Sequence, residues 1–259
     1  MGIDINTLIN PLMAIWLPFV RILAFIQFSP IVDQRIFPIK VKVLLSLLLS
    51  AIITPMLTHN VVLKELMSIQ SMVLIGEQII WGFVFGTMLQ LVFTALQMAG
   101  HILSFNMGLG MAVMNDPSSG ASTTVIAQFI FVFVALLFFA MDGHLLLISI
   151  LYKGFIYWPI GEALNALSFK TLALNLGWVI SSATLLALPT TFIMLIVQGA
   201  FGLLNRVSPS LNLFSLGFPV SMLFGIFCLM LLMKVIPEHY ISLTNVILER
   251  FDALRNYHG

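Results

Sequence analysis

The residues GHILSFNMGLGMAVMNDPSSGAST, which occupy Gly100–Thr123, lie between two long apolar stretches. They contain four glycines, one acidic residue, Asp116, and three methionines, Met107, Met111 and Met114. Glycine permits tight or left-handed backbone, and methionine fills irregular gaps with a flexible side chain. The segment is too rich in glycine for a plain membrane helix and too apolar for a solvated loop. The sequence therefore predicts a deformable apolar loop that the rest of the chain holds in place.

The composition of the whole chain indicates an integral membrane protein or a buried subunit of a membrane complex. The chain has 259 residues, of which 60% are hydrophobic and 8% charged, and its mean hydropathy is +1.10. Soluble domains carry about 25% charged residues, so this inventory cannot cover a water-exposed surface. The net charge of +1 provides no basic face for nucleic acid. The single cysteine, Cys228, excludes an intramolecular disulfide and a cysteine-rich metal site.

Apolar runs divide the chain into expected helices at residues 8–28, 43–57, 72–103, 125–150 with an interruption, 171–205 and 218–236, followed by an amphipathic tail at 237–259. Run 72–103 is too long for one simple bilayer span, and run 43–57 is too short. Pro189 is expected to kink run 171–205. Lysine and arginine residues are divided almost equally between the two expected sides of the membrane. Their count therefore does not determine the orientation of the chain in the membrane. We therefore expect other subunits, rather than lipid, to cover much of the apolar surface.

Short signals refine this outline. Gly82 and Gly86 form a small-xxx-small pair, which allows two membrane helices to pack closely. The residues Asp142-Gly143-His144 interrupt an apolar run and are typical of a turn or helix break. Residues 160–170 are polar and mark an internal boundary, and a turn rich in Gly, Pro, Ser and Asn is expected at Asn205–Pro219.

The sequence contains no recognised catalytic, metal-binding or cofactor-binding motif. We therefore expect no catalytic residue, no metal and no cofactor, and a membrane enzyme is disfavoured. A stand-alone transporter remains an alternative, with Arg21, Glu77 and Asp142 as its coupling charges. A structural carboxylate at a subunit contact is the other interpretation of Glu77.

Five segments in this order and spacing resemble the FliR family of flagellar type III secretion export-gate proteins. The segments are SPIVDQRIFPIKVK (Ser29–Lys42), FNMGLGMAVMNDPSSG (Phe105–Gly120), DGHLLLISI (Asp142–Ile150), ALP (Ala187–Pro189) and GLLNRVSPSLNLFSLGFP (Gly202–Pro219). The resemblance covers nearly the whole chain. Virulence injectisomes contain equivalent subunits, which are the alternative, but the Gly/Met-rich stretch ending in Asp116-Pro117 favours the flagellar group.

The resemblance implies an all-α subunit of a polytopic membrane complex, built of long, kinked helical hairpins. A FliP-like part would span residues 1–165 and include the central plug loop 105–123. A FliQ-like hairpin with an amphipathic C-terminal helix would span residues 166–259. The family assembles with FliP, FliQ and FlhB in the bacterial inner membrane, within the flagellar basal body. The expected activity is protein export rather than catalysis: the subunit helps to form and seal a channel for unfolded flagellar proteins.

The resemblance also implies the functional residues. The plug would consist of residues that line or close the channel: Phe105, Asn106, Met107, Gly108, Leu109, Gly110, Met111, Ala112, Val113, Met114, Asn115, Asp116 and Pro117. A subunit contact or the cytoplasmic entrance would involve a second, smaller set: Glu77, Asn205, Arg206 and Pro209. The resemblance also narrows this segment: the helix before the plug is expected to end near Ser104, and the sealing part is expected to be Phe105–Asn115. An ordinary packed interhelical loop is the alternative for this stretch.

Overall fold

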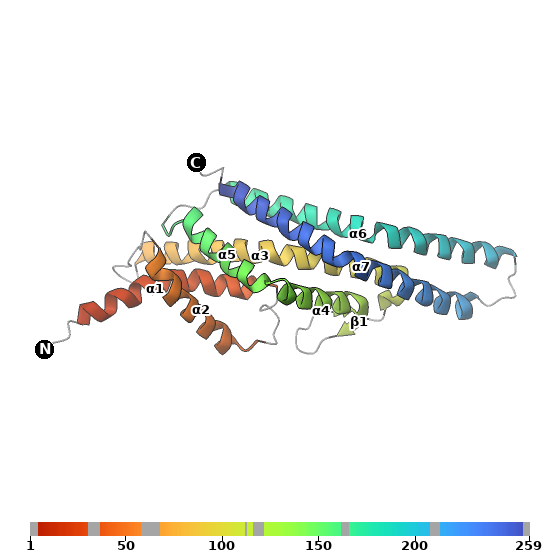
Figure 1. Cartoon of the computed structure of the whole chain (residues 1–259), viewed down its shortest axis with the longest axis horizontal. Coiled ribbons are helices and arrows are strands. Elements are labelled where there is room, and N and C mark those ends of the chain that lie inside the picture. Colours follow the sequence, from red (N-terminus) through yellow and green to blue (C-terminus); the bar gives the residue numbers. More distant parts are fainter. Residues whose placement is uncertain are drawn as a thin grey trace. The chain divides into compact units, whose positions relative to one another are not determined.

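The computed structural model describes residues 5–30, 37–57, 68–111, 113–115, 122–161, 166–207 and 213–255 (Figure 1). The longer helices are α1 (Ile5–Phe28), α2 (Ile39–Ile53), α3 (Ile69–Asn106), α4 (Val125–Ala140), α5 (Gly143–Tyr157), α6 (Ala166–Val207) and α7 (Leu213–Arg255). Short elements complete the described chain: the 3-10 turns η1 (Thr54–Met56) and η2 (Leu109–Met111), and the strands β1 (Val113–Asn115) and β2 (Ser122–Thr124). The expected all-α fold class is therefore confirmed, with one two-stranded addition.

The chain forms two compact units. The first comprises Met1–Gln90, Asp142–Ala173 and Arg250–Gly259, and thus holds α1, α2, the first part of α3, α5, the start of α6 and the end of α7. The second comprises Leu91–Met141 and Leu174–Glu249, and thus holds the rest of α3, α4 and most of α6 and α7. Each unit has its own buried core.

In the first unit, α1 rests directly on the two small residues of α3. A Cβ atom added at Gly82 would overlap the carbonyl oxygen of Arg21 and would lie 2.6 Å from Cβ of Ala24. One added at Gly86 would lie 2.7 Å from the carbonyl oxygen of Phe25. The small-xxx-small pair therefore forms a helix contact, as the sequence predicts. The neighbouring atoms are mostly backbone atoms of α1, which cannot move aside as a flexible side chain could.

Substituting Gly82 by alanine is expected to destabilise the first unit by more than 1 kcal/mol, because overpacked cores lose about 1–3 kcal/mol. Gly76 on the same helix is the matched control, since a Cβ there would meet nothing within 4 Å. Gly76→Ala should instead stabilise the helix slightly. Thermal unfolding of both variants in detergent measures the difference. Equal unfolding temperatures for the two variants would contradict the assigned contact.

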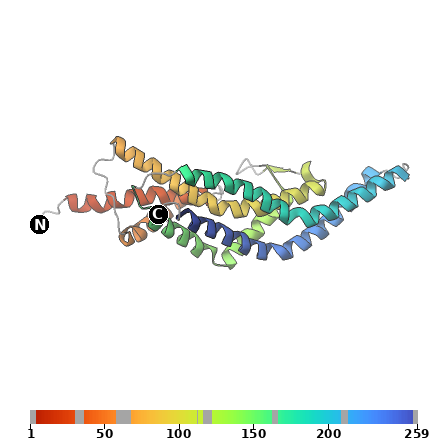
Figure 2. The ribbon, with the colours of Figure 1, turned by 90° about the horizontal axis from the view of Figure 1, so that it is seen from above.

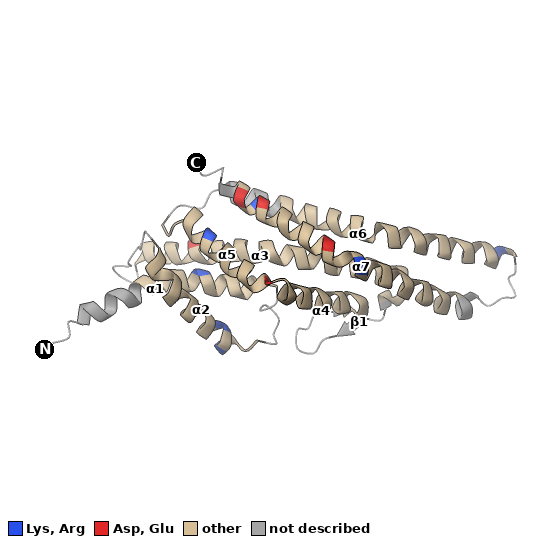
Figure 3. Ribbon diagram, in the orientation of Figure 1, with Lys and Arg blue, Asp and Glu red and all other residues tan. Residues whose placement is uncertain are grey.

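In the second unit, α6 and α7 lie side by side (Figure 1, Figure 2). Phe93 of α3 lies at the centre of an aromatic cluster, with ring centroids 5.9 Å from those of Phe131 and Phe138 and 6.4 Å from that of Tyr240. The part of α6 that belongs to this unit carries one charged residue, Arg206, in its last turn (Figure 3).

The described residues include four helices that are long and apolar enough to cross a membrane, or five if α4 and α5 count as one broken span. The expected break at Asp142 is present: this residue has a left-handed φ of 55° and separates α4 from α5. The long apolar run before the central loop forms one helix, α3, of 38 residues.

Two expected boundaries are wrong. The turn predicted at Asn205–Pro219 is shorter, because α6 continues to Val207 and α7 already begins at Leu213. The expected end of a helix at residue 236 is absent, because α7 continues through Pro237 to Arg255. A proline can lie within an apolar helix where neighbouring helices and side chains satisfy the freed backbone groups.

Candidate channel-sealing site

The loop between α3 and α4 begins at a polar anchor on α6. The Asn106 side chain, at the last residue of α3, donates from Nδ2 to Oγ1 of Thr191 over 2.9 Å. The carbonyl of Asn106 accepts a hydrogen bond of 2.7 Å from Nε2 of Gln198. The last carbonyls of a helix have no partner within the helix, so Gln198 caps the end of α3.

The next two residues anchor the loop to α7. Met107 is 1% exposed, and its side chain fills the space beside Gly225, where any added Cβ would overlap it. Gly108 follows with φ of +77°, a conformation that L side chains rarely adopt. A Cβ at Gly108 would lie 3.4 Å from the ring of Phe218. The chain therefore turns at a glycine directly after a buried methionine.

Phe105 lies in the last turn of α3, just before the turn at Gly108. Its side chain is 63% exposed, whereas that of Met107 is buried. A Cβ at Gly110, in η2, would overlap the ring of Phe105. Beyond η2, β1 and β2 pair antiparallel, with Val113 opposite Thr124 and Asn115 opposite Ser122. The sequence did not predict this pairing, because three-residue strands carry no recognisable period.

The loop ends at a second polar anchor. Thr124 precedes α4, and its Oγ1 accepts a hydrogen bond of 3.4 Å from the backbone N–H of Ala127. The same hydroxyl is hydrogen-bonded to Nδ1 of His101, on α3, over 3.2 Å. Threonine is a favoured N-cap because its side chain satisfies a free N–H at the helix start. Both ends of the loop are therefore fixed within one compact unit.

The structure places most of the expected plug residues. Phe105 and Asn106 belong to α3, so this helix ends two residues later than the expected Ser104. Leu109 and Gly110 lie in η2 with Met111, while Val113, Met114 and Asn115 form β1. Ala112, Asp116 and Pro117 lie outside the described residues, as does Pro209 of the expected entrance.

The other two expected entrance residues, Asn205 and Arg206, are exposed in the last turn of α6. A cation is favoured at a helix C-terminus because it complements the partial negative charge there. Within the described part of the chain, no three His, Cys, Asp or Glu side chains form a group that could hold a metal ion.

A separate polar cluster lies in the core of the first unit, around Arg21 of α1. Arg21 is fully buried, and its Nε donates to Oε1 of Gln78 over 2.7 Å. Its Nη1 donates to the carbonyls of Trp158, over 2.8 Å, and Gly154, over 3.2 Å. The guanidinium carbon lies 4.6 Å from the ring centroid of Phe155. Arg21 therefore joins α1, α3 and the last turn of α5.

Glu77 lies beside this cluster and interacts electrostatically with Arg21. It is half-buried, and its Oε2 is buried with no hydrogen-bond partner among the described residues. Asp142, by contrast, is exposed at the start of α5. Of the three charges in the transporter alternative, the structure thus brings together Arg21 and Glu77.

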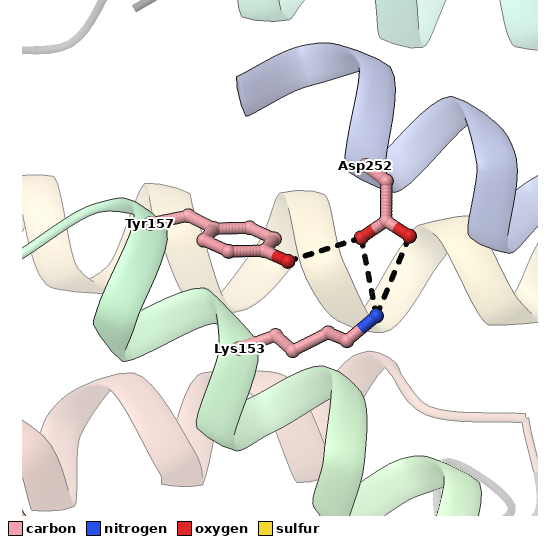
Figure 4. A network of polar contacts seen from close by, with 3 residues as sticks. All are labelled: Lys153, Tyr157 and Asp252. Carbon is pink, nitrogen blue, oxygen red and sulfur yellow. Dashed lines mark hydrogen bonds and ion pairs between the residues drawn. The ribbon is translucent and has the colours of Figure 1, made fainter. Parts of the chain in front are cut away.

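The end of α7 is tied to α5 in the same unit. Phe251 is buried, with ring centroids 5.3 Å from Phe85 and 5.6 Å from Trp158. The neighbouring Asp252 accepts from Nζ of Lys153 over 3.2 Å and from the Tyr157 hydroxyl over 3.4 Å (Figure 4). The aromatic contacts carry most of this attachment, because the ion pair is partly exposed and worth little in water.

Comparison with known proteins places the chain in a family. Flagellar biosynthetic protein FliR of Pectobacterium carotovorum subsp. carotovorum is 36% identical over 241 residues, which cover 92% of this chain and 89% of the relative. FliR of Escherichia coli (strain K12) is 36% identical over 229 residues, 87% of each chain. Yop proteins translocation protein T of Yersinia pestis is 28% identical over 169 residues, 62% of this chain and 65% of the relative. The family model for bacterial export proteins, family 1, matches residues 12–246, and the chain belongs to this family.

Proposed function

We propose that the chain is a subunit of the flagellar type III protein export gate in the bacterial inner membrane. The observation that carries this proposal is the 36% identity to two FliR proteins over 92% and 87% of the chain. The apolar helices long enough to cross a membrane are consistent with that location. A flagellar role is preferred to an injectisome role, because the injectisome relative is 28% identical and covers 62% of the chain. The proposal assigns no catalytic step to the chain.

The loop between α3 and α4 is proposed to seal the resting channel. Its first residues are held by Thr191, Gln198 and Gly225, and its last by His101, so its position is defined at both ends. Methionine and glycine give the segment between them a flexible apolar surface. Such a surface can close on itself or around an extended polypeptide with few specific contacts to break. A general exporter of unfolded flagellar proteins needs this tolerance.

The partners of the proposed gate are FliP-like, FliQ-like and FlhB-like subunits. Large apolar side chains are exposed along α6, including Leu188, Phe192 and Leu195. Monomeric soluble proteins rarely expose continuous apolar surface on this scale, so these side chains favour contact with other subunits or lipid. The division into a FliP-like part, 1–165, and a FliQ-like hairpin, 166–259, belongs to the proposal. So does an entrance role for Asn205 and Arg206.

The proposed function is tested by flagellar secretion. A strain that lacks the chain should release no filament protein into the medium and should be non-motile. Expression of the intact chain from a plasmid should restore both properties. Normal secretion in the strain that lacks the chain would contradict the proposed function.

Replacement of Gln198 by leucine is expected to loosen the plug. The leucine side chain has a similar size but cannot donate to the Asn106 carbonyl, which leaves the end of α3 uncapped. A hydrogen bond of this kind contributes about 1 kcal/mol, so the ratio of open to closed gates should rise about fivefold. Ion leak across membranes that contain the assembled gate measures this ratio.

Thr184→Val is the matched control on α6, because the Thr184 hydroxyl donates only within its own helix, to the carbonyl of Ile180. This variant should leave the ion leak unchanged. An equal leak for Gln198→Leu and the intact chain would show that Gln198 does not hold the loop.

A further inference from the structure

Helix α2 buries polar side chains and exposes apolar ones, which is the reverse of the pattern in a surface helix of a soluble protein. Its buried polar side chains recur every four residues and continue into η1: Lys42, Ser46, Ser50 and Thr54. Apart from Lys40 in the first turn, its exposed large side chains are aliphatic: Ile39, Val41, Val43, Leu44, Leu45, Leu47, Leu48 and Ile52. Surface helices of soluble proteins present the opposite arrangement. The outward face of α2 is therefore not a water-facing surface.

The buried stripe of α2 is satisfied without an external partner. The Ser46 hydroxyl donates to the carbonyl of Lys42 over 2.7 Å, and the Thr54 hydroxyl to that of Ser50 over 2.6 Å. Nζ of Lys42 donates to Oε1 of Gln27, at the end of α1, over 3.2 Å. The small hydroxyl residues and the one buried ammonium of α2 are thus all turned inward.

The outward face lacks the features of a second helix contact. Helix interfaces in membranes are enriched in small residues and in side chains that hydrogen-bond across the contact. The α1–α3 contact follows this rule through Gly82 and Gly86. On the outward face of α2, by contrast, the polar side chain among the described residues is Lys40, at the start of the helix, and the rest is branched aliphatic apart from Ala51. This composition matches lipid tails better than a tightly packed protein partner.

The length and charge of α2 with η1 fit a segment that crosses the bilayer once. Ile39–Met56 has 18 residues. At about 1.5 Å per residue it extends about 27 Å, close to the roughly 30 Å hydrocarbon core of a bilayer. Lys40 is exposed at the first turn. Anionic lipid headgroups attract such a cation with about 1 kcal/mol per residue.

We propose that α2 is a lipid-facing helix of the assembled protein, with acyl chains against its Leu44 and Leu48 face and anionic phospholipid headgroups at Lys40. This inference is independent of the loop between α3 and α4. It also refines the expectation that other subunits cover the apolar surface, because it assigns one element to lipid.

Site-specific photo-crosslinking tests the inference in native membranes. The photoreactive amino acid p-benzoylphenylalanine is introduced at Leu48 in a strain whose secretion is intact, and the adduct is identified by mass spectrometry. A phospholipid adduct is expected. The matched control carries the same probe at Phe85, which is fully buried in the first unit and should give no lipid adduct. A probe at Leu44 repeats the measurement if the Leu48 variant does not accumulate.

An adduct with another protein chain, with a second copy of this chain, or no adduct at all would overturn the inference. Intact secretion in the same strain would leave the proposed export function unaffected. The headgroup preference is tested in vesicles of phosphatidylethanolamine and phosphatidylglycerol, with the probe at Val41. Lys40→Gln should lower the phosphatidylglycerol share of the adducts about fivefold, the change that about 1 kcal/mol per lysine produces. An unchanged share would overturn the role of Lys40.

Discussion

Replacement of Arg21 by methionine is expected to remove nearly all of the chain from the membrane fraction. Methionine keeps much of the apolar stem of arginine but none of its donors. The substitution leaves Oε1 of Gln78 and the carbonyls of Gly154 and Trp158 without the hydrogen bonds that Arg21 makes. Breaking a buried charged network costs about 3–5 kcal/mol. This is a large part of the 5–15 kcal/mol that stabilises a typical domain.

The Arg21 prediction is measured as the amount of chain in the membrane and its unfolding temperature in detergent. Arg206→Met is the control, because this arginine is exposed at the end of α6. It should accumulate normally. The double variant Arg21→Met with Glu77→Gln should be more stable than Arg21→Met alone, since it also removes the carboxylate beside the lost guanidinium. Normal accumulation of Arg21→Met would show that the cluster does not hold α1, α3 and α5 together.

Glu77→Gln alone is expected to preserve most secretion if Glu77 has a structural role beside Arg21. Glutamine keeps the shape of the side chain and loses only its charge. Severe and pH-dependent loss of secretion in an assembled complex would instead favour a proton-linked role for Glu77.

Removal of the plug is expected to open the gate to ions. Replacement of Met107–Asn115 by an equal number of Gly and Ser residues keeps the chain length but removes the buried Met107 and the η2 and β1 segments. Burial of a methionine contributes about 1.5–3 kcal/mol. Its loss alone should raise the ratio of open to closed gates at least tenfold. Ion flux through the purified, reconstituted complex measures this ratio.

The same Gly and Ser replacement distinguishes a channel-sealing plug from an ordinary packed interhelical loop. A simple connection between α3 and α4 would tolerate the exchange with unchanged ion flux, as long as the complex still assembles. Gly225→Val provides a milder version, because its side chain would displace Met107 while the loop itself stays intact. It should raise the flux less than the full replacement does.

The features that the sequence predicts well are those that depend on neighbours along the chain. The helix break at Asp142 follows from local polar and glycine residues within an apolar run. Gly82 and Gly86 are four residues apart, so their common face is a property of any helix. The turn at Gly108 likewise follows from a residue that tolerates positive φ.

The features that it misses depend on contacts between distant residues. The acceptors of Arg21 lie 57, 133 and 137 positions away in the sequence, and no local period indicates them. The same holds for the capping of Asn106 by Gln198, which is 92 positions away. The inverted face of α2 is visible in the sequence as a four-residue repeat of polar side chains. Whether this polar stripe faces the interior or the outside depends on the position of α1, which the sequence does not provide.

The membership of a multi-subunit export gate is tested most directly by affinity purification of the full chain from native membranes in mild detergent, followed by identification of the co-purifying subunits. We predict that FliP-like and FliQ-like chains co-purify with it, and that the chain is unstable when they are absent. Purification of the chain alone, as a stable protein that binds a small solute, would contradict the account and support the transporter alternative.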